Sequence, residues 1–425
     1  MDENKQTGEA ASDLPEQLNI EAFPAEETEA APEPESPVPE AQPAKSGKKP
    51  ARRQSRLVRR IMAAILTILL VILAILVFVF REDLSGEGLR RIFGRENSVT
   101  PAREAFTYET GAEQVFAPAG DGLAVASSSS VQLLNAKGQT VFKQVVSFDV
   151  PAVFACEETA LFCDLSGTEF IVAGMDGESR TLSSGDDSRE IRTADMNASG
   201  WFTLVTEEPG YKGLVSVYNA ACEKQYEWWS GAGYVLRAAV SPDNKTLGVL
   251  TVESEGTILR FFALNSETPL AEMTFSGTLV YDLSFVGNNT VRAVGDTGFY
   301  LISTNGTLRS NYDLGGRYLL EYDFGSESFT ALFVSDYRGG GGGTLLTLDA
   351  QGKVLAEQAL ERDVVSLSAS GKQLLVMTGG GLVLYDSGLV RQYANETLMT
   401  ARRAILRPSG DILLLSAYSA ERFSF

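Results

Sequence analysis

The chain has 425 residues, with 36 Lys and Arg against 55 Asp and Glu, no His, and a net charge of −19. The absence of His excludes Ser-His-Asp and Cys-His nucleophiles and His-ligated metal sites. The acidic balance argues against nucleic acid as a partner, because a phosphate-binding surface needs clustered cations. We therefore expect no catalytic residues, no metal and no cofactor.

The first 60 residues divide into two segments of opposite charge. Residues 1–44 hold twelve acids, one Lys and many Pro and Ala, so they cannot bury enough apolar surface to offset the conformational entropy of folding. We expect them to form a disordered, acidic, cytoplasmic tail. Residues 45–60 hold eight Lys and Arg and no acid. They directly precede a long apolar run, which predicts a basic juxtamembrane segment.

Residues 61–80, IMAAILTILLVILAILVFVF, contain no charge, Pro or Gly. Twenty helical residues at about 1.5 Å each span the roughly 30 Å hydrocarbon core of a bilayer. The basic flank predicts a cytoplasmic N-terminus, and the length of the run favours an uncleaved signal anchor over a cleaved signal peptide. We expect a single-pass, type II protein of the plasma membrane, with a stalk at residues 81–103 and the remainder outside the cytoplasm.

Residues 104–425 are predicted to form an all-β domain. Short runs of Val, Leu, Phe, Tyr and Thr alternate with Gly, Asp, Asn and Ser, and no long run of helical period interrupts them. One polar turn recurs about every 41 residues ahead of a strongly apolar strand, which is typical of a four-stranded propeller blade. Its eight copies lie at residues 119–122, 157–159, 197–200, 241–245, 287–289, 325–327, 369–372 and 408–411.

A second turn recurs between the third and fourth strands of each unit, with Asn, Asp or Gly where a tight turn needs positive φ. Its seven copies lie at residues 135–138, 176–177, 219–221, 265–266, 305–306, 349–352 and 386–388. The chain thus ends after the third strand of its eighth unit, which leaves an unpaired edge. We expect residues 103–110 to supply the missing strand beside the C-terminal AERFSF. This gives eight blades, with seven as the alternative.

One of these turns carries a family resemblance. Ser241, Pro242, Asp243, Asn244 and Lys245, followed by TLGVL, resemble the SPDG-type turn of WD40-like and YVTN-like bacterial β-propellers. With its basic flank, anchor and LSxxxLRR-like stretch at residues 84–91, the chain is similar to uncharacterised, single-pass, extracytoplasmic propeller proteins of low-GC Gram-positive bacteria. The resemblance covers residues 45–425, and it implies no chemistry.

Two of the three Cys stand close together in the sequence. Cys156 and Cys163 flank the turn at residues 157–160 with a spacing suited to facing positions on a hairpin, and outside the cytoplasm such a pair can form a disulfide. Two small buried hydrophobic side chains are the other interpretation. Cys222 is left over, so it is either buried or a free thiol.

Two further features are candidate binding sites. Trp228 and Trp229 lie in an outer strand of the third unit, so one ring is expected to face a neighbouring blade and the other to face solvent or a partner. A loop with five consecutive glycines is expected to be mobile and to serve as a binding loop, although it lacks the continuation of a phosphate-binding loop. Its candidate residues are Asp336, Tyr337, Arg338, Gly339 and Gly343.

These features favour a membrane-anchored, extracytoplasmic propeller that acts as a non-catalytic binding scaffold for a protein or a cell-envelope polymer. An enzyme acting on carbohydrate through Asp, Glu and Tyr groups is one alternative, and it requires inward-pointing carboxylates and Arg at the mouth of the channel. Adjacent carboxylates such as Glu207 and Glu208 are expected to be solvated in turns rather than catalytic. A sensor coupled to the cytoplasmic tail is the other alternative.

Overall fold

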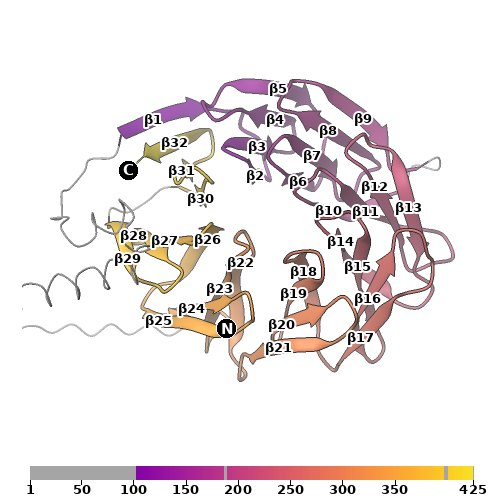
Figure 1. Cartoon of the computed structure of the whole chain (residues 1–425). Coiled ribbons are helices and arrows are strands. Elements are labelled where there is room, and N and C mark those ends of the chain that lie inside the picture. The colour runs from indigo at the N-terminus through magenta and orange to yellow at the C-terminus, as the bar shows by residue number, and fades with distance from the viewer. Residues whose placement is uncertain (1–101, 186–188, 397–400, 425) are drawn as a thin grey trace, which may run out of the picture. The chain divides into compact units, whose positions relative to one another are not determined.

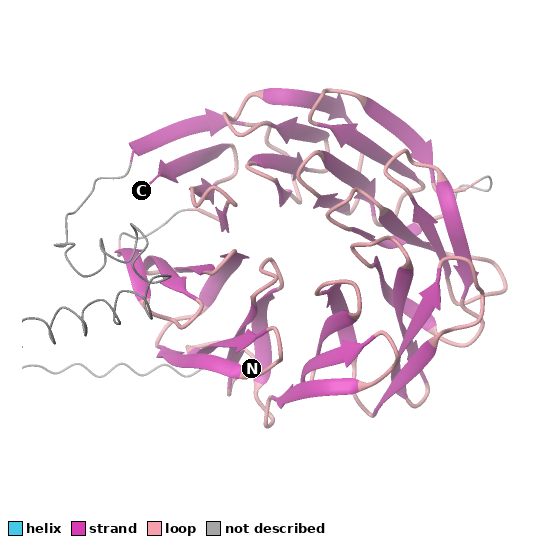
Figure 2. Ribbon diagram, viewed as in Figure 1, coloured by secondary structure: helices cyan, strands magenta, loops and turns pink. Residues whose placement is uncertain are grey.

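The protein forms a ring of eight four-stranded antiparallel sheets in the computed structural model (Figure 1), which describes residues 102–185, 189–396 and 401–424. The all-β, eight-bladed propeller is confirmed, and the seven-bladed alternative is wrong. Strands and loops make up the described part (Figure 2), in which no helix is long and apolar enough to cross a membrane. The predicted tail, basic segment and membrane helix, and almost all of the stalk, lie outside the described residues.

The strands follow one another in chain order, four to a blade. Blades 1 to 4 comprise β2 (Val115–Ala119), β3 (Gly122–Ala126), β4 (Ser130–Leu134), β5 (Thr140–Val145); β6 (Pro151–Ala155), β7 (Thr159–Asp164), β8 (Glu169–Gly174), β9 (Ser179–Ser183); β10 (Ile191–Met196), β11 (Phe202–Thr206), β12 (Leu214–Tyr218), β13 (Lys224–Trp229); and β14 (Tyr234–Val240), β15 (Thr246–Glu253), β16 (Gly256–Ala263), β17 (Ala271–Ser276).

Blades 5 to 7 comprise β18 (Val280–Phe285), β19 (Thr290–Gly295), β20 (Gly298–Ser303), β21 (Leu308–Asp313); β22 (Tyr318–Asp323), β23 (Phe329–Ser335), β24 (Gly343–Asp349), β25 (Val354–Leu360); and β26 (Val364–Ser370), β27 (Gln373–Thr378), β28 (Gly381–Asp386), β29 (Arg391–Asn395). Blade 8 comprises β30 (Arg403–Leu406), β31 (Ile412–Leu415), β32 (Ser419–Ser424) and β1 (Ala102–Thr107).

The eighth blade is built from both ends of the described chain. β1 pairs antiparallel with β32, and Ala102 lies opposite Ser424. Tyr108, directly after β1, fastens the closure, because its hydroxyl donates to the carbonyl oxygens of Ser416 at 2.7 Å and Ser419 at 2.9 Å. The predicted closure of the ring by its first and last strands is therefore confirmed.

The ring has two faces with different kinds of connection. The turns from first to second strand and from third to fourth strand lie on one side, which we call the turn face. The connections from second to third strand and from blade to blade lie on the other side, which we call the loop face. Because Ala102 pairs with the last residue of β32, β1 runs from the turn face to the loop face. The chain before Ala102 therefore joins the propeller at the turn face.

The core is divided into eight apolar clusters, one at each junction between neighbouring blades. In blade 1 the side chains of β3 and β4 are all buried, which explains why these strands read as continuous apolar runs. β5 lies at the outer rim (Figure 1) and contains only exposed and half-buried residues. At the closing junction Phe116 and Leu123 of blade 1 share a cluster with Ile405 and Leu413 of blade 8, so the seam is packed like the other junctions.

Hydrogen bonds between successive blades tie the turn face together. Asn197 closes its own turn by accepting from the backbone N–H of Trp201 at 3.0 Å, and its Nδ2 donates to the Ser241 carbonyl oxygen of the next blade at 3.0 Å. Arg407 donates to the Ala136 carbonyl oxygen at 3.1 Å across the closing junction. Short polar side chains recur in these turns because they can bond to nearby backbone groups.

Candidate functional site

Exposed aromatic rings gather on the loop face. Among the described residues six Tyr and Trp side chains are exposed, and all six lie in loop-face connections or at the strand ends beside them: Tyr211, Trp229, Tyr234, Tyr318, Tyr337 and Tyr418. Tyr337 is 72% exposed and Tyr418 is 62% exposed. None of the six belongs to the turn face. Exposed Tyr and Trp are typical of binding surfaces, so the loop face is the candidate binding face.

A pocket of about 480 Å³ lies on this face at blades 3 and 4. The connection from β11 to β12 forms one wall, and the start of β14 forms another. We call it the loop-face pocket. The residues that give it its chemistry are Arg192, Thr206, Glu207, Glu208, Tyr211, Lys212 and Tyr234.

The charges of the loop-face pocket are paired with one another and with their neighbours. Arg192 forms an ion pair with Glu207 and a second, at 2.9 Å, with Glu190. Arg189 Nε lies 2.8 Å from Glu208 Oε2, and the side chain of Glu208 is only 13% exposed. The expectation that the carboxylate pair is solvated is therefore wrong for Glu208. The pairing fixes planar carboxylate and guanidinium groups along the wall of the pocket.

Two other side chains of the pocket offer groups to a ligand. The ammonium of Lys212 lies 4.9 Å from the centre of the Tyr234 ring, a contact that orients the ring while 60% of the side chain stays exposed. Thr206 is buried, and its hydroxyl has no hydrogen-bond partner in the described part of the chain. Buried hydroxyls are normally satisfied, so this one has an unmet hydrogen-bonding capacity at the wall of the pocket.

The five-glycine loop is on the loop face, as the connection between β23 and β24. Asp363 holds it, because its Oδ1 accepts from the backbone N–H of Gly341 at 2.7 Å and of Gly342 at 3.1 Å. These bonds to the ionised form hold the pKa of Asp363 below its ordinary value. Gly343 already belongs to β24. The candidate binding loop is therefore pinned at one end and presents the ring of Tyr337 at the other.

The two adjacent tryptophans of β13 face opposite ways, as predicted. Trp228 packs against Phe262 of the next blade with ring centres 5.0 Å apart, and it contacts the cluster between blades 3 and 4. Trp229 is 39% exposed on the loop face. Of the two candidate surface aromatics, Trp229 is therefore the exposed ring and Trp228 is the half-buried one.

The three Cys are free thiols. The β6–β7 register places Cys163 opposite Ala152, whereas the backbone N–H of Cys156 bonds to Thr159 within the turn. Cys156 and Cys163 do not face each other, so the facing arrangement expected for a disulfide is not formed. Burial raises the pKa of the Cys163 thiol to about 12, in keeping with the interpretation of Cys163 as a small buried hydrophobic side chain. Cys222 is half-buried.

A charged network lies on the innermost strands of blades 3 to 6, and we call it the axial network. Arg237 of β14 is its centre, with Nε 2.9 Å from Asp282 of β18 and Nη2 3.4 Å from Asp195 of β10. Tyr322 of β22 donates to Asp282 at 2.8 Å. A β-bulge directly precedes Arg237 and Asp282 at the same point of their strands, so equivalent backbone positions present both.

Burial shapes the electrostatics near the axis. It raises the pKa of Asp195 to about 7, against the opposing effect of Arg237. In β22, burial also raises the pKa of Asp323 to about 6 and the pKa of Glu321 above its ordinary value, and Arg403 opposes both shifts. The inner strands therefore carry carboxylates and arginines, the groups that the carbohydrate-enzyme alternative requires. In the axial network, however, each carboxylate already pairs with Arg237.

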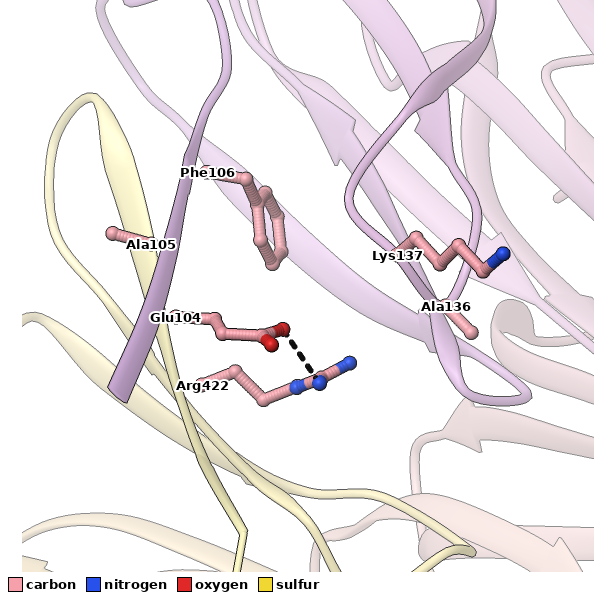
Figure 3. A pocket seen from close by; sticks show the side chains of 6 residues that line it. All are labelled: Glu104, Ala105, Phe106, Ala136, Lys137 and Arg422. Carbon is pink, nitrogen blue, oxygen red and sulfur yellow. Dashed lines mark ion pairs between the residues drawn. The ribbon is translucent and has the colours of Figure 1, made fainter. Parts of the chain in front are cut away.

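A second pocket, of about 370 Å³, lies at the seam between β1, β32 and the last turn of blade 1. Figure 3 shows Glu104 and Arg422 joined as an ion pair, at 2.6 Å, with the ring of Phe106 facing the turn that contains Ala136 and Lys137. The charges here link the first and last strands. We therefore assign this pocket to the closure of the ring.

The sequence did not reveal the axial network or the loop-face pocket. A charged residue shortly before the first turn of successive repeats, as at Asp195, Arg237 and Asp282, is the signal that could have indicated the network. No comparable signal marked Thr206 and Tyr234, because connections between strands bring them together. Within the described ranges, no group of three or more Cys, Asp and Glu side chains is placed to hold a metal ion.

Solved structures share this fold. The computationally designed Ika8 protein matches with a TM-score of 0.56 and 10% identity, over 75% of this chain and 98% of that one. The C-terminal WD40 domain of Sif2 matches with a TM-score of 0.54 and 10% identity, over 75% and 97%. BamB from Moraxella catarrhalis matches with a TM-score of 0.50 and 11% identity, over 76% and 98%. At such identities the likeness concerns the fold alone.

Sequence comparison places the chain in a family without assigning it an activity. No curated protein matches it significantly. The model of a family of unknown function, DUF5711, matches residues 98–410, which include seven complete blades and two strands of the eighth, β30 and β1. The chain therefore belongs to the DUF5711 family.

Proposed function

We propose that this propeller is a non-catalytic binding scaffold, held outside the cytoplasm by a single membrane helix at residues 61–80, and that its loop face binds a protein or a cell-envelope polymer. Within the residues that the structure describes, all six exposed Tyr and Trp side chains lie on that face, and this concentration carries the proposal. Tyr and Trp provide large contact areas at a low cost in side-chain entropy. Loops on a rigid scaffold are also the usual location of binding residues.

The direction in which the chain enters the propeller supports the same arrangement. β1 begins at the turn face, only about twenty residues beyond the predicted membrane helix. Attachment of the predicted anchor through the turn face would leave the loop-face residues free of the chain's own linker. A partner in the envelope would then have access to the aromatic residues.

An enzyme acting on carbohydrate is a second candidate, because the axial network brings Asp195 and Asp282 to the two sides of Arg237. Two carboxylates in different environments are the usual acid and base of glycoside hydrolysis. We favour the scaffold since both carboxylates are engaged with Arg237, and Asp282 also accepts from Tyr322. Glycan cleavage by the purified chain that Asp195→Asn abolishes would establish the enzyme instead.

Site-specific photo-cross-linking tests the binding face. A photoreactive amino acid would replace Tyr234, Tyr337 or Tyr418 on the loop face, and Asn305 or Lys372 on the turn face as matched controls, in the full chain expressed in cells. We expect reproducible adducts from the loop-face positions only. Adducts from the turn-face positions alone would show that the turn face, and not the loop face, binds the partner.

The membrane topology has its own test. A Tyr337→Cys variant places a thiol on an exposed side chain of the loop face, and a Cys in residues 1–44 serves as the cytoplasmic control. An impermeant thiol reagent applied to intact cells is expected to label the first and not the second. Labelling of the tail instead of the loop-face thiol would show that the membrane orientation is the opposite of the proposed one.

Deletion of residues 1–44 tests the sensor alternative, which requires that the deletion abolish function.

A further inference from the structure

The loop-face pocket has the composition of a site for a ligand that is both polar and apolar. Tyr211 and Tyr234 are 50% and 60% exposed, so much of each ring is free of protein contacts. The pocket also presents carboxylate, guanidinium and ammonium groups beside these rings. Its volume of about 480 Å³ lies in the range of sites for small ligands or short polymer segments rather than whole protein surfaces.

The charges of the pocket are balanced. Arg192 and Lys212 contribute two positive charges, and Glu207 and Glu208 contribute two negative charges. Such a lining gives no net attraction to a polyanion or a polycation, because the opposite charges cancel beyond the Debye length. The ligand that complements it is therefore neutral and rich in hydrogen-bonding groups.

Sugar rings have this chemistry. A pyranose has faces of C–H groups, which pack on an aromatic ring because the ring face carries partial negative charge. Its rim of hydroxyls both donates and accepts, and it can bond to paired carboxylate and guanidinium groups. The buried Thr206 hydroxyl, which lacks a partner in the described chain, is an additional group of this kind in the wall of the pocket.

We propose that the loop-face pocket binds a segment of a neutral polysaccharide, with Tyr211 and Tyr234 as stacking platforms and Arg192, Glu207 and Thr206 as hydroxyl-binding groups. This proposal rests on the binding role assigned above to the loop face, and it specifies the class of partner. A proline-rich peptide is the competing ligand, because aromatic grooves also bind polyproline helices.

The test uses the full-length chain, purified in detergent, on an array of neutral oligosaccharides of three to six sugars, including N-acetylated ones. A ten-residue polyproline peptide and dextran sulfate are the comparison probes. We expect saturable binding to a neutral oligosaccharide, weakened about tenfold by Tyr234→Ala or Tyr211→Ala, which corresponds to about 1.4 kcal/mol. The matched control Val390→Ala truncates an equally exposed side chain on the turn face, outside the pocket, and leaves binding unchanged.

The Thr206→Val variant separates binding from folding. In the free protein the Thr206 hydroxyl has no partner to lose within the described residues, so the variant is expected to unfold at the same or a higher temperature than the wild type. It should nevertheless bind the oligosaccharide several-fold more weakly. Unchanged oligosaccharide binding by Thr206→Val would show that the Thr206 hydroxyl does not contribute to the site.

Three results would overturn the proposal. These are the absence of binding to every neutral oligosaccharide, binding that Tyr234→Ala does not affect, and Tyr234-dependent binding of polyproline or dextran sulfate in place of oligosaccharide. The scaffold function would survive any of them if Tyr337 and Tyr418 positions still cross-linked a protein in cells. Loss of the cross-links as well would overturn both.

Discussion

The two faces of this propeller are built from the same strands but have opposite properties. On the turn face, side chains such as Asn197, Ser326 and Arg407 donate to backbone carbonyls of the next blade. On the loop face, the exposed rings of Tyr211, Trp229, Tyr234, Tyr318, Tyr337 and Tyr418 are free of such bonds between blades. The turn face holds the ring together, and the loop face is available to a partner.

The difference shows how a repeat protein separates stability from recognition. The turns recur in every blade because each has the same task, which is to reverse the chain and contact the next turn. The loop-face connections differ in length and composition from blade to blade, as the seven residues between β11 and β12 and the two residues between β15 and β16 show. Variation is tolerated there, since the packing at eight junctions and the bonds of the turn face hold the ring together. Only some loop-face groups also join neighbouring blades, such as the Thr257 hydroxyl, which accepts from the backbone N–H of Val280 at 3.0 Å.

The largest loss of stability is expected from a substitution at one of two turn-face glycines, Gly138 and Gly177. Gly138 and Gly177 occupy equivalent turns with φ of +74° and +86°, but an added Cβ would lie 2.2 Å from Phe106 at Gly138 and no closer than 3.5 Å to any atom at Gly177. We expect Gly177→Ala to cost about 1 kcal/mol in the free energy of unfolding, from positive φ alone. Gly138→Ala should cost about 3 kcal/mol or more, because it also displaces Phe106 of the closing strand. Equal losses in urea titrations would contradict this account of the seam.

An asparagine pair isolates the bonds between blades. Asn197 closes its turn and also donates to Ser241 at 3.0 Å and Asn244 at 2.7 Å in the next blade, whereas Asn305 only closes its own turn, accepting from Thr307 at 3.1 Å. We expect Asn197→Ala to lower the free energy of unfolding by about 2 kcal/mol and Asn305→Ala by about 0.5 kcal/mol. The difference between the two losses, measured by urea titration, is the contribution of the bonds between blades. Equal losses for Asn197→Ala and Asn305→Ala would show that these bonds do not stabilise the ring.

The axial network lies between the two faces and should make stability depend on pH. Burial raises the pKa of Asp195 to about 7 in the folded protein, against about 3.9 for an ordinary Asp. The folded state thus binds this proton more tightly than the unfolded state, so the contribution of Asp195 is complete below about pH 4 and is lost as the pH rises through 7. The two pKa values alone correspond to about 3 kcal/mol between pH 4 and pH 7, and solvent screening of this 23% exposed side chain reduces that figure. The Asp195→Asn variant should therefore gain at least about 1 kcal/mol on the wild type over this range. A constant difference across this range would show that Asp195 does not titrate there.

The propeller and its closure were predictable from the sequence because they depend on local, repeated chemistry. Turns rich in Asn, Asp, Ser and Gly mark strand reversals wherever they occur, and counting eight of one kind against seven of the other identified the missing strand. The pairing of β1 with β32 then followed from the need to cover an open edge.

The candidate site was less predictable because it depends on contacts between distant segments. The alternation of side chains along a strand predicted that one of Trp228 and Trp229 faces a neighbouring blade, but not which one. The contact of Trp228 with Phe262 of the next blade decides it. Thr206 reads in the sequence as an ordinary strand residue. Its unpaired hydroxyl appears only when the neighbouring connection and the start of β14 are placed around it.

The smallest effect on stability is expected on the loop face. Tyr337 is 72% exposed, and its hydrogen bonds, with Ser335 and Gly340, are made by backbone atoms that a substitution leaves in place. We expect Tyr337→Ser to change the free energy of unfolding by no more than about 0.5 kcal/mol, as is usual for surface positions. A loss near that of Asn197→Ala would show that the loop face also holds the ring together. The division of labour between the two faces would then be wrong.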